Sequence, residues 1–243
     1  MKTFTNILGI AMKKVILIML STIALCIADQ RHFVWTYEYK TVSRGEAEFE
    51  HYYTTSYPNS SDLSDGTKVG HQLELEIGMN ERYDFAIYHQ FEQMDNNFTY
   101  KGYKLRGRYR LGEQNQYFMD PLLYLEYHGK PDFSEHGIET KLILAKETER
   151  LIVSLNPVME IEIEDKEQEI ETEYAAGLTY KLNKLFHFGI EFKGSENGHY
   201  WGPTISHGTH DIWLSLGSAF ALGTIKEGKP EMEIRMIMGV GLK

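Results

Sequence analysis

Apolar and polar residues alternate with a period of two over most of the chain beyond about residue 44. In residues 72–79, the side chains of Leu73 and Leu75 face one way and those of Glu74 and Glu76 the other. This spacing is typical of a β-strand that is apolar on one face only. No later segment has the 3.6-residue repeat of an amphipathic helix. The pattern therefore predicts an all-β protein.

About twelve runs of this kind follow one another. They span approximately residues 45–55, 69–80, 83–93, 98–111, 117–128, 136–147, 150–163, 168–182, 185–194, 200–207, 210–222 and 230–242. Most are long enough for a tilted transmembrane strand, which needs roughly 9–11 residues. We therefore expect a single up-and-down antiparallel transmembrane β-barrel of about twelve strands with a polar, charged lumen.

The connections between the runs are expected to alternate in length. Tight turns are predicted at residues 80–82, 147–149, 182–184 and 208–209, and an intermediate one at 112–116. Longer connections are predicted around residues 56–68, 93–98, 129–135, 163–168, 194–199 and 223–229. Bacterial barrels have an even strand number, short periplasmic turns and longer external loops. This pattern places both termini in the periplasm.

The first 28 residues have the features of a secretory signal peptide. They hold three lysines and no acidic residue, and the apolar run over residues 15–25 is too short for a bilayer span, which takes roughly 20 residues. The small residues Cys26 and Ala28 predict cleavage after Ala28. Met12 is an equally good start, so residues 1–11 can be an extension of the true sequence. The chain thus divides into a signal peptide at 1–28, an N-terminal segment at 29–44 and a barrel at 45–243.

Cys26 is the only cysteine. A lipoprotein anchor on Cys26 is an alternative, but the preceding Leu25 is large where that processing requires a small residue, so we expect Cys26 to be discarded. Removal of the three signal lysines leaves 22 basic residues against 35 acidic ones, a formal net charge of −13. This charge argues against nucleic acid as a partner.

A soluble β-sandwich is the alternative fold, because its strands also alternate. Three features favour the membrane barrel: the signal peptide, the charge confined to one face of nearly every run, and aromatic residues near the run ends, as in interfacial girdles. No apolar stretch after Ala28 is long enough for a transmembrane helix, and a membrane protein without such helices must be a closed barrel. We therefore expect a bacterial outer membrane as the location, with lipid and the barrel-assembly machinery as partners.

Three segments depart from a simple barrel pattern. The chain ends Val240-Gly241-Leu242-Lys243, without the terminal aromatic residue that such barrels often carry. Pro157 lies inside a predicted strand and lacks a ladder donor, so a bulge or strand end is expected nearby. The aromatic alternation over residues 33–40 predicts either a short extra strand or a segment tucked under the barrel.

Several segments resemble a family of uncharacterised bacterial outer-membrane β-barrels that includes transporter-like and porin-like proteins. They are SRGEAEFE (43–50), LELEIGMNERYDFAIY (73–88), LLYLEY (122–127), ETKLILAK (139–146) and GPTI (202–205). The segments follow one another in order over most of the mature chain. The resemblance implies a barrel fold and an outer-membrane location. It transfers no substrate or catalytic residue, because the family has none established.

Charged residues of the polar faces are expected to line the lumen, since a charge that faces lipid costs roughly 2–4 kcal/mol for Arg or Lys at mid-bilayer. The candidates are Lys104, Arg106, Arg108, Arg110, Glu48, Glu50, Glu74, Glu76, Glu126, Glu160, Glu162, Glu169, Glu171, Glu173 and Glu191. Like charges on neighbouring strands destabilise the pair. Three compensations stay open: salt bridges with the basic strand, water and counter-ions in an open pore, or a divalent cation at the external mouth.

Three functions follow from this lumen. The first is passive passage or binding of small hydrophilic solutes or cations, and the second is a structural barrel closed by salt bridges. The third, a lipid-modifying enzyme, rests on Ser206, His207 and His210, but adjacent strand residues point to opposite faces, so Ser206 and His207 do not form a dyad. We therefore predict no catalytic residue. Since no phosphate loop, zinc-ligand spacing or haem motif occurs, we also predict no cofactor and no metal site.

Overall fold

The computed structural model describes residues 30–63, 66–95, 97–164, 167–209 and 211–242. The predicted signal peptide, with Cys26 and Met12, lies outside these residues. Within them, no helix is long and apolar enough to cross a membrane.

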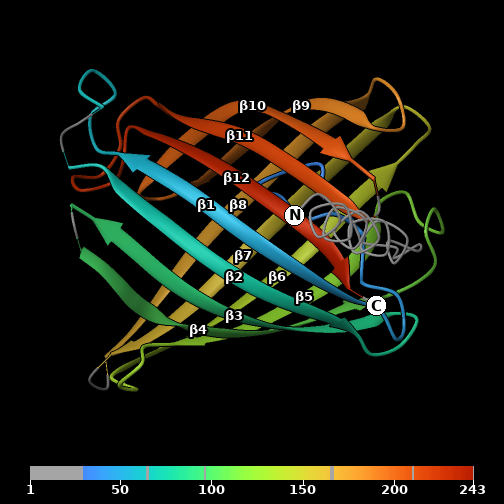
Figure 1. Cartoon of the computed structure of the whole chain (residues 1–243), viewed down its shortest axis with the longest axis horizontal. Coiled ribbons are helices and arrows are strands. Elements are labelled where there is room, and N and C mark those ends of the chain that lie inside the picture. The colour runs from blue at the N-terminus through green and yellow to red at the C-terminus, as the bar shows by residue number, and fades with distance from the viewer. Residues whose placement is uncertain (1–29, 64–65, 96, 165–166, 210, 243) are drawn as a thin grey trace, which may run out of the picture.

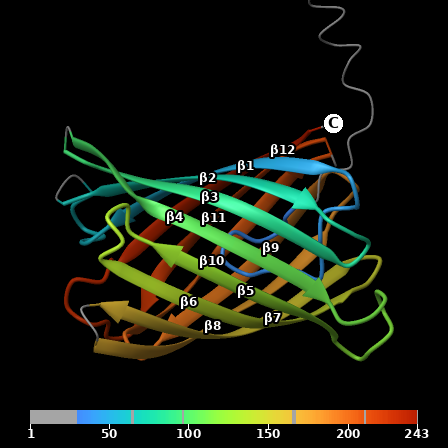
Figure 2. The same cartoon turned by 90° about the horizontal axis from the view of Figure 1, so that it is seen from below.

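Twelve antiparallel strands form one closed barrel (Figures 1 and 2). The strands are β1 (Ala47–Tyr57), β2 (Lys68–Gly78), β3 (Tyr83–Met94), β4 (Asn97–Arg110), β5 (Asp120–Gly129), β6 (Glu135–Glu147), β7 (Leu151–Glu164), β8 (Glu167–Lys181), β9 (Phe186–Ser195), β10 (Gly198–Gly208), β11 (Ile212–Leu222) and β12 (Met232–Leu242). Each strand pairs with its neighbours in sequence, and β1 pairs with β12, with Ala47 opposite Leu242. The predicted fold class is confirmed.

The alternation in the sequence corresponds to the two faces of the barrel wall. In β2, the side chains of Glu74 and Glu76 are buried inside, whereas Leu75 between them is exposed on the outer face. The same alternation runs through β7, in which Leu151, Val153 and Leu155 face outward. The outer surface is therefore apolar and the interior polar, as a membrane-embedded barrel requires.

The two ends of the barrel differ in what they carry. At one end of the barrel β1 begins and β12 ends, with Ala47 opposite Leu242, and we call it the terminus end. The opposite, hairpin end carries the β1–β2, β3–β4, β5–β6, β7–β8, β9–β10 and β11–β12 connections. The predicted alternation of loop length is wrong at three of these, since only two residues separate β3 from β4, β7 from β8 and β9 from β10. Strand pairing continues further there and absorbs the residues expected in loops.

The expectation of a bulge or strand end near Pro157 is also wrong. β7 continues past Pro157, and its pairing with β8 is unbroken. On the β6 side, pairing stops at Val158 and resumes at Leu155 with the same register. Because Pro157 has no N–H donor, the ladder between β6 and β7 is interrupted there, but its register does not change. The register shift that the structure shows lies between Gln90 and Phe91 in β3.

The residues before β1 enter the barrel. Residues 33–40 do not form a strand; they run through the lumen, where the blue trace is visible inside the wall in Figures 1 and 2. Phe33, Val34, Thr36 and Tyr37 are buried there. The aromatic alternation that suggested an extra strand therefore belongs to a segment that fills part of the interior.

Candidate functional site

Residues 30–42, which we call the plug, form a loop inside the lumen. Its two arms are joined near the terminus end, where the backbone N–H of His32 donates to Glu38 Oε1 (2.6 Å) and His32 Nδ1 lies 2.8 Å from Glu38 Oε2. Lys40 Nζ donates to the carbonyl of Gln30 at 2.7 Å. These contacts hold the arms side by side and project the tip into the middle of the barrel.

Glu38, His32 and Lys40, which we call the base of the plug, interact electrostatically. Burial alone would raise the pKa of the Glu38 carboxyl, but His32 and Lys40 beside it hold that pKa well below its ordinary value. Burial lowers the pKa of His32, against the opposing effect of Glu38. The base therefore favours a charged carboxylate and a neutral imidazole.

One wall carboxylate holds the tip of the plug. Glu191, in the middle of β9, accepts hydrogen bonds from the backbone N–H groups of Val34 (2.8 Å), Trp35 (2.9 Å) and Thr36 (2.8 Å). Three successive N–H groups form a concave anion site, and bonds to an ionised acceptor are stronger than neutral ones. Glu191 is 2% exposed, so this contact lies out of reach of bulk water.

Polar wall side chains satisfy the rest of the plug backbone. Asn156 Oδ1 accepts from the N–H of Tyr37 at 2.5 Å, and Asn156 Nδ2 donates to the carbonyl of Tyr37 at 3.1 Å. Ser154 Oγ donates to the same carbonyl, and Ser215 Oγ donates to the carbonyl of Arg31, both at 2.5 Å. The plug does not join a β-ladder, so hydrogen bonds with wall side chains take its place. Buried backbone N–H and C=O groups need such partners.

Glycines in the wall make room for the side chains of the plug. A Cβ at Gly177 would lie 2.4 Å from Phe33 Cε1, and one at Gly217 would lie 2.5 Å from Val34 Cγ2. Both distances are far below van der Waals contact. The wall of β8 and β11 is therefore shaped to the plug at these two points.

A buried ionic cluster lies beside the plug on β2, β3 and β4. Arg106 contacts Glu74 (2.7 Å) and Glu76 (2.5 Å), and Arg108 contacts Glu76 (2.8 Å) and Asp84 (2.6 Å). All these groups are nearly or fully buried. The pairs run along the wall between nearby strands, so the basic strand compensates its neighbours without crossing the lumen.

The plug itself contributes charge to this interior. Arg31 lies 3.8 Å from Glu50 and donates to the Tyr52 hydroxyl at 2.5 Å. Its guanidinium lies 4.4 Å from the centre of the Tyr37 ring. Glu48 accepts a hydrogen bond from the indole of Trp213.

A cavity of about 520 Å³ occupies the lumen between the plug and the hairpin end. Its lining includes Val34, Trp35 and Tyr37 of the plug, and it reaches Asn197 and Pro230 in the connections of the hairpin end. The plug therefore forms the floor of a chamber whose mouth lies at the hairpin end. We call this chamber the vestibule.

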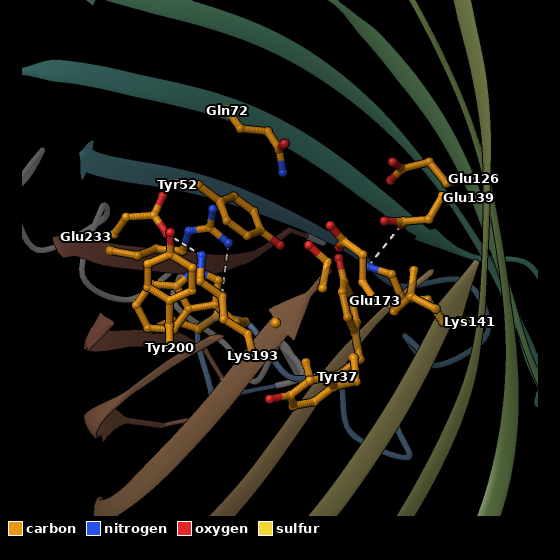
Figure 3. A pocket seen from close by; sticks show the side chains of 18 of the residues that line it. Tyr37, Tyr52, Gln72, Glu126, Glu139, Lys141, Glu173, Lys193, Tyr200 and Glu233 are labelled. Atoms are coloured by element: carbon orange, nitrogen blue, oxygen red, sulfur yellow. Dashed lines mark hydrogen bonds and ion pairs between the residues drawn. The ribbon is translucent and has the colours of Figure 1, made fainter. Parts of the chain in front are cut away.

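Ion pairs lie on opposite sides of the vestibule. Figure 3 shows Lys193, Glu233 and Tyr200 on one side, and Lys141 with Glu139 on the other. The ammonium of Lys141 is 4.6 Å from the centre of the Tyr124 ring, and that of Lys193 is 5.2 Å from that of Tyr200. The walls thus combine paired charges with aromatic faces, a surface suited to a polar solute.

The remaining predicted lumen residues are distributed along the barrel. Lys104 pairs with Glu126 at 2.6 Å in the vestibule wall, which Glu173 also lines. Nearer the hairpin end, Glu160 lies 3.5 Å from His128. Ligand atoms of His128, Glu160 and Glu162 lie within 4.8 Å of one another, a spacing open to a cation.

Three predicted lumen residues lie at the rims. Glu169 is exposed and Glu171 half-buried, because β8 pairs with β9 only from Glu173 onward. At the terminus end, the Arg110 guanidinium donates to the backbone carbonyl of Glu81.

The residues behind the enzyme hypothesis are separated. Ser206 is buried and faces the lumen, whereas His207 is exposed on the outer face. Ser206 Oγ is 3.4 Å from Nδ1 of His187, whose ring packs edge-on against His32 with 4.4 Å between ring centres. The Ser206 hydroxyl is therefore enclosed beside the base of the plug. His210 lies outside the described residues.

Glu191 and Glu50 are among the lumen residues that the sequence predicts. The other wall residues that contact the plug, which together with Glu191 we call its seat, are not. The missed residues are Ser154, Asn156, Gly177, Ser215 and Gly217. The signal available in the sequence was a small or amide side chain at inward strand positions, as in the run Ser215, Gly217 and Ala219 of β11.

No protein-family model and no curated protein sequence matches the chain. Among solved structures, the NanC porin is 12% identical and superposes with a TM-score of 0.52, covering 81% of this chain and 99% of that one. The chain folds as a porin-type barrel. A bacterial polysaccharide outer membrane secretin (9% identity, 81% and 98% coverage, TM-score 0.46) and the outer membrane protein opdK from Pseudomonas aeruginosa (8%, 81% and 97%, 0.33) are looser matches. At these identities the likeness concerns the fold of the barrel.

Proposed function

We propose that this barrel resides in a bacterial outer membrane and that its lumen binds and passes small hydrophilic solutes. The observation that carries the proposal is the polar vestibule of about 520 Å³, which has its mouth at the hairpin end and the plug as its floor. The apolar outer face and the porin-type fold support the location. Export by a signal peptide cleaved after Ala28 is part of the same proposal.

The lining of the vestibule favours solutes that are small and polar. Its volume lies within the range of small-molecule sites, roughly 300–1,000 Å³. Charges such as Lys193 and Lys141 are already paired with wall glutamates and backed by aromatic rings. A neutral or weakly charged solute with several hydroxyl or amide groups can exchange hydrogen bonds there without leaving a buried charge unpaired.

The orientation follows from the end of the barrel at which β1 begins and β12 ends. In bacterial barrels with an even strand number, both termini lie on the periplasmic side. The hairpin end, with the vestibule mouth, then faces outward, and the plug lies on the periplasmic side. Outer-membrane lipid around the wall and the barrel-assembly machinery during biogenesis are the corresponding partners.

A structural barrel with a closed lumen is a second candidate. The seated plug and the buried cluster around Arg106 favour it, because together they fill the terminus half of the interior. Barrels of 16–18 strands enclose channels, whereas about eight strands are filled by side chains, so twelve strands permit either state.

Swelling of proteoliposomes in glycerol, glucose and raffinose distinguishes the two candidates. We expect the wild-type barrel to admit these solutes at rates that fall with solute size. In the Glu173→Trp variant, a bulky indole projects from the wall into the vestibule. Solute entry should slow about tenfold or more, which corresponds to a rise of about 1.4 kcal/mol or more in the free-energy barrier to entry. Glu169→Trp is the matched control on the same strand and should have no effect, since Glu169 lies at the rim. Absence of swelling for correctly folded protein, both for wild type and for a Glu191→Ala variant that lacks the carboxylate holding the plug, would establish the closed barrel instead.

A further inference from the structure

We propose that the plug is a releasable gate: its residues 30–41 leave the lumen as one unit, while its last residue, Val42, and residues 43–46 remain attached to the wall. This inference rests on the proposed passage of solutes and adds its regulation. The seated plug shown by the structure is the closed state, and its departure joins the vestibule to the terminus end.

The anchor of the plug is separate from its seat. The N–H of Val42 donates to Asp84 Oδ2 at 3.0 Å, and the N–H of Gly45 donates to the carbonyl of Gly78 at 3.0 Å. A Cβ at Gly78 would lie 1.9 Å from the Ser43 carbonyl oxygen, so the anchor packs directly on the end of β2. Gly45 has a φ of +79°, which glycine adopts without strain. The chain thus turns from the plug into β1 at a fixed point.

The barrel does not depend on the plug for its strand pairing. All twelve strands are paired on both sides, and β1 closes on β12. Release of the plug therefore exposes no unpaired strand edge in the described wall. A plug that served as a missing strand would be unable to leave without opening the sheet.

The contacts of the seat are of a kind that water can replace. Wall side chains of β7, β9, β11 and β12 bond to plug backbone atoms, through Asn156, Glu191, Ser215 and Arg235. Each of these groups stays hydrated when the lumen fills with water. Water-mediated bonds are nearly as favourable as direct ones.

Apolar packing makes the seated state the resting one. Tyr37 and Tyr39 pack on Leu122 and Ile143 of the wall. Release exposes these side chains to water, which costs free energy in proportion to their area. The closed state thus predominates until something shifts the balance toward release.

A disulfide between plug and wall tests the gate in the full chain. A Cβ at position 217 would lie 2.5 Å from Val34 Cγ2, which places the two Cβ atoms near the separation of a disulfide, about 3.5–4.5 Å. The test variant is Val34→Cys with Gly217→Cys. Cys26, the only native cysteine, lies in the predicted signal peptide, and none occurs in residues 30–242. The single variants Val34→Cys and Gly217→Cys are the controls.

The readouts are planar-bilayer conductance and proteoliposome swelling with glucose, each before and after reduction by dithiothreitol. We expect the oxidised double variant to conduct at least about tenfold less than the reduced one, and wild type and the single variants to ignore the reductant. Equal conductance in the two states, with the disulfide verified by thiol labelling, would overturn the gate while leaving passage intact. No conductance in any form, wild type included, would overturn the proposed passage itself. Failure of the disulfide to form would contradict the contact between Val34 and Gly217.

A second variant tests the gate independently, in case the double-cysteine protein misfolds. Glu191→Ala removes the acceptor of three plug N–H groups. We expect its mean conductance to exceed that of wild type about tenfold or more. The matched control, Glu169→Ala, removes a rim carboxylate that does not touch the plug and should conduct like wild type. If Glu191→Ala also conducts like wild type, the plug does not limit the current.

Discussion

At the residue scale, Arg106 illustrates how a barrel can hold opposite charges away from water. Its guanidinium reaches Glu74 and Glu76, and it also donates to the hydroxyl of Tyr88. A buried ion pair adds little net stability compared with an apolar replacement of both partners. Loss of one partner, however, leaves an uncompensated buried charge.

Truncation of Arg106 should therefore destabilise the barrel strongly. We expect Arg106→Ala to lower the free energy of unfolding by about 3–5 kcal/mol, because Glu74 loses its ion partner in a buried site and Glu76 keeps only Arg108. Arg82→Ala is the control, since Arg82 pairs with Glu113 at the surface and such pairs contribute about 0–1 kcal/mol. Urea unfolding followed by the mobility shift between folded and unfolded barrel measures both. A similar loss in the two variants would mean that the cluster is not buried.

The residue-level prediction from sequence was strongest where one strand alone determined the answer. Glu48, Glu50, Glu74 and Glu76 alternate with apolar residues, and the structure buries all four inside. Glu169 follows the same alternation, yet it is exposed because β9 ends before reaching it. The alternation indicates on which face of the wall a side chain lies. Whether an inward side chain is buried also depends on how far the neighbouring strand extends.

At the element scale, the strand runs could be predicted because a one-sided strand has a period that no helix shares. Boundaries fell within about three residues of the observed ones, for example 69–80 against Lys68–Gly78 in β2. The plug could not be placed in the same way. Its partner Glu191 is more than 150 positions away, and hydrogen bonds from its irregular backbone leave no periodic trace.

The base of the plug should make seating depend on pH. The pKa of His32 is lowered from its ordinary 6.5, so the released plug binds a proton there more readily than the seated one. The pKa of Glu38 is also lowered, so its ion pair contributes at neutral pH and is lost as acid protonates it. The His32 effect stabilises the seated plug above about pH 6.5 and weakens as the pH falls, whereas the Glu38 effect is lost only below the ordinary carboxyl pKa of 4.5.

We therefore expect conductance to rise as the pH falls from about 7.5 to about 5.5, the range in which histidine titrates. The titratable groups that act on His32 are Glu38 and Lys40 of the plug, His187 of β9 and Glu147 of β6. His32→Gln should flatten the pH dependence, because a neutral amide keeps a hydrogen bond to Glu38 without titrating. Bilayer recordings of both proteins measure it. Conductance that decreases with acid in the wild type would contradict this account of the base.

At the scale of the whole molecule, the barrel combines two features that the sequence shows separately. The alternating strands predict the wall, and the net negative charge with its basic strand predicts a polar interior. Their combination with residues 30–42 produces a vestibule with a floor. That floor depends on the glycines at 177 and 217, whose role becomes visible only when Phe33 and Val34 lie against them.

The most direct test of this architecture compares two serine positions on the two sides of the plug. Ser195 lines the vestibule, whereas Ser215 is buried behind the plug tip and bonds to Arg31. Intact cells that display Ser195→Cys or Ser215→Cys are treated with a membrane-impermeant maleimide. We predict that Ser195→Cys is labelled from outside and Ser215→Cys is not, until Glu191→Ala is added. Equal labelling of both positions without that change would contradict a lumen closed by the N-terminal segment.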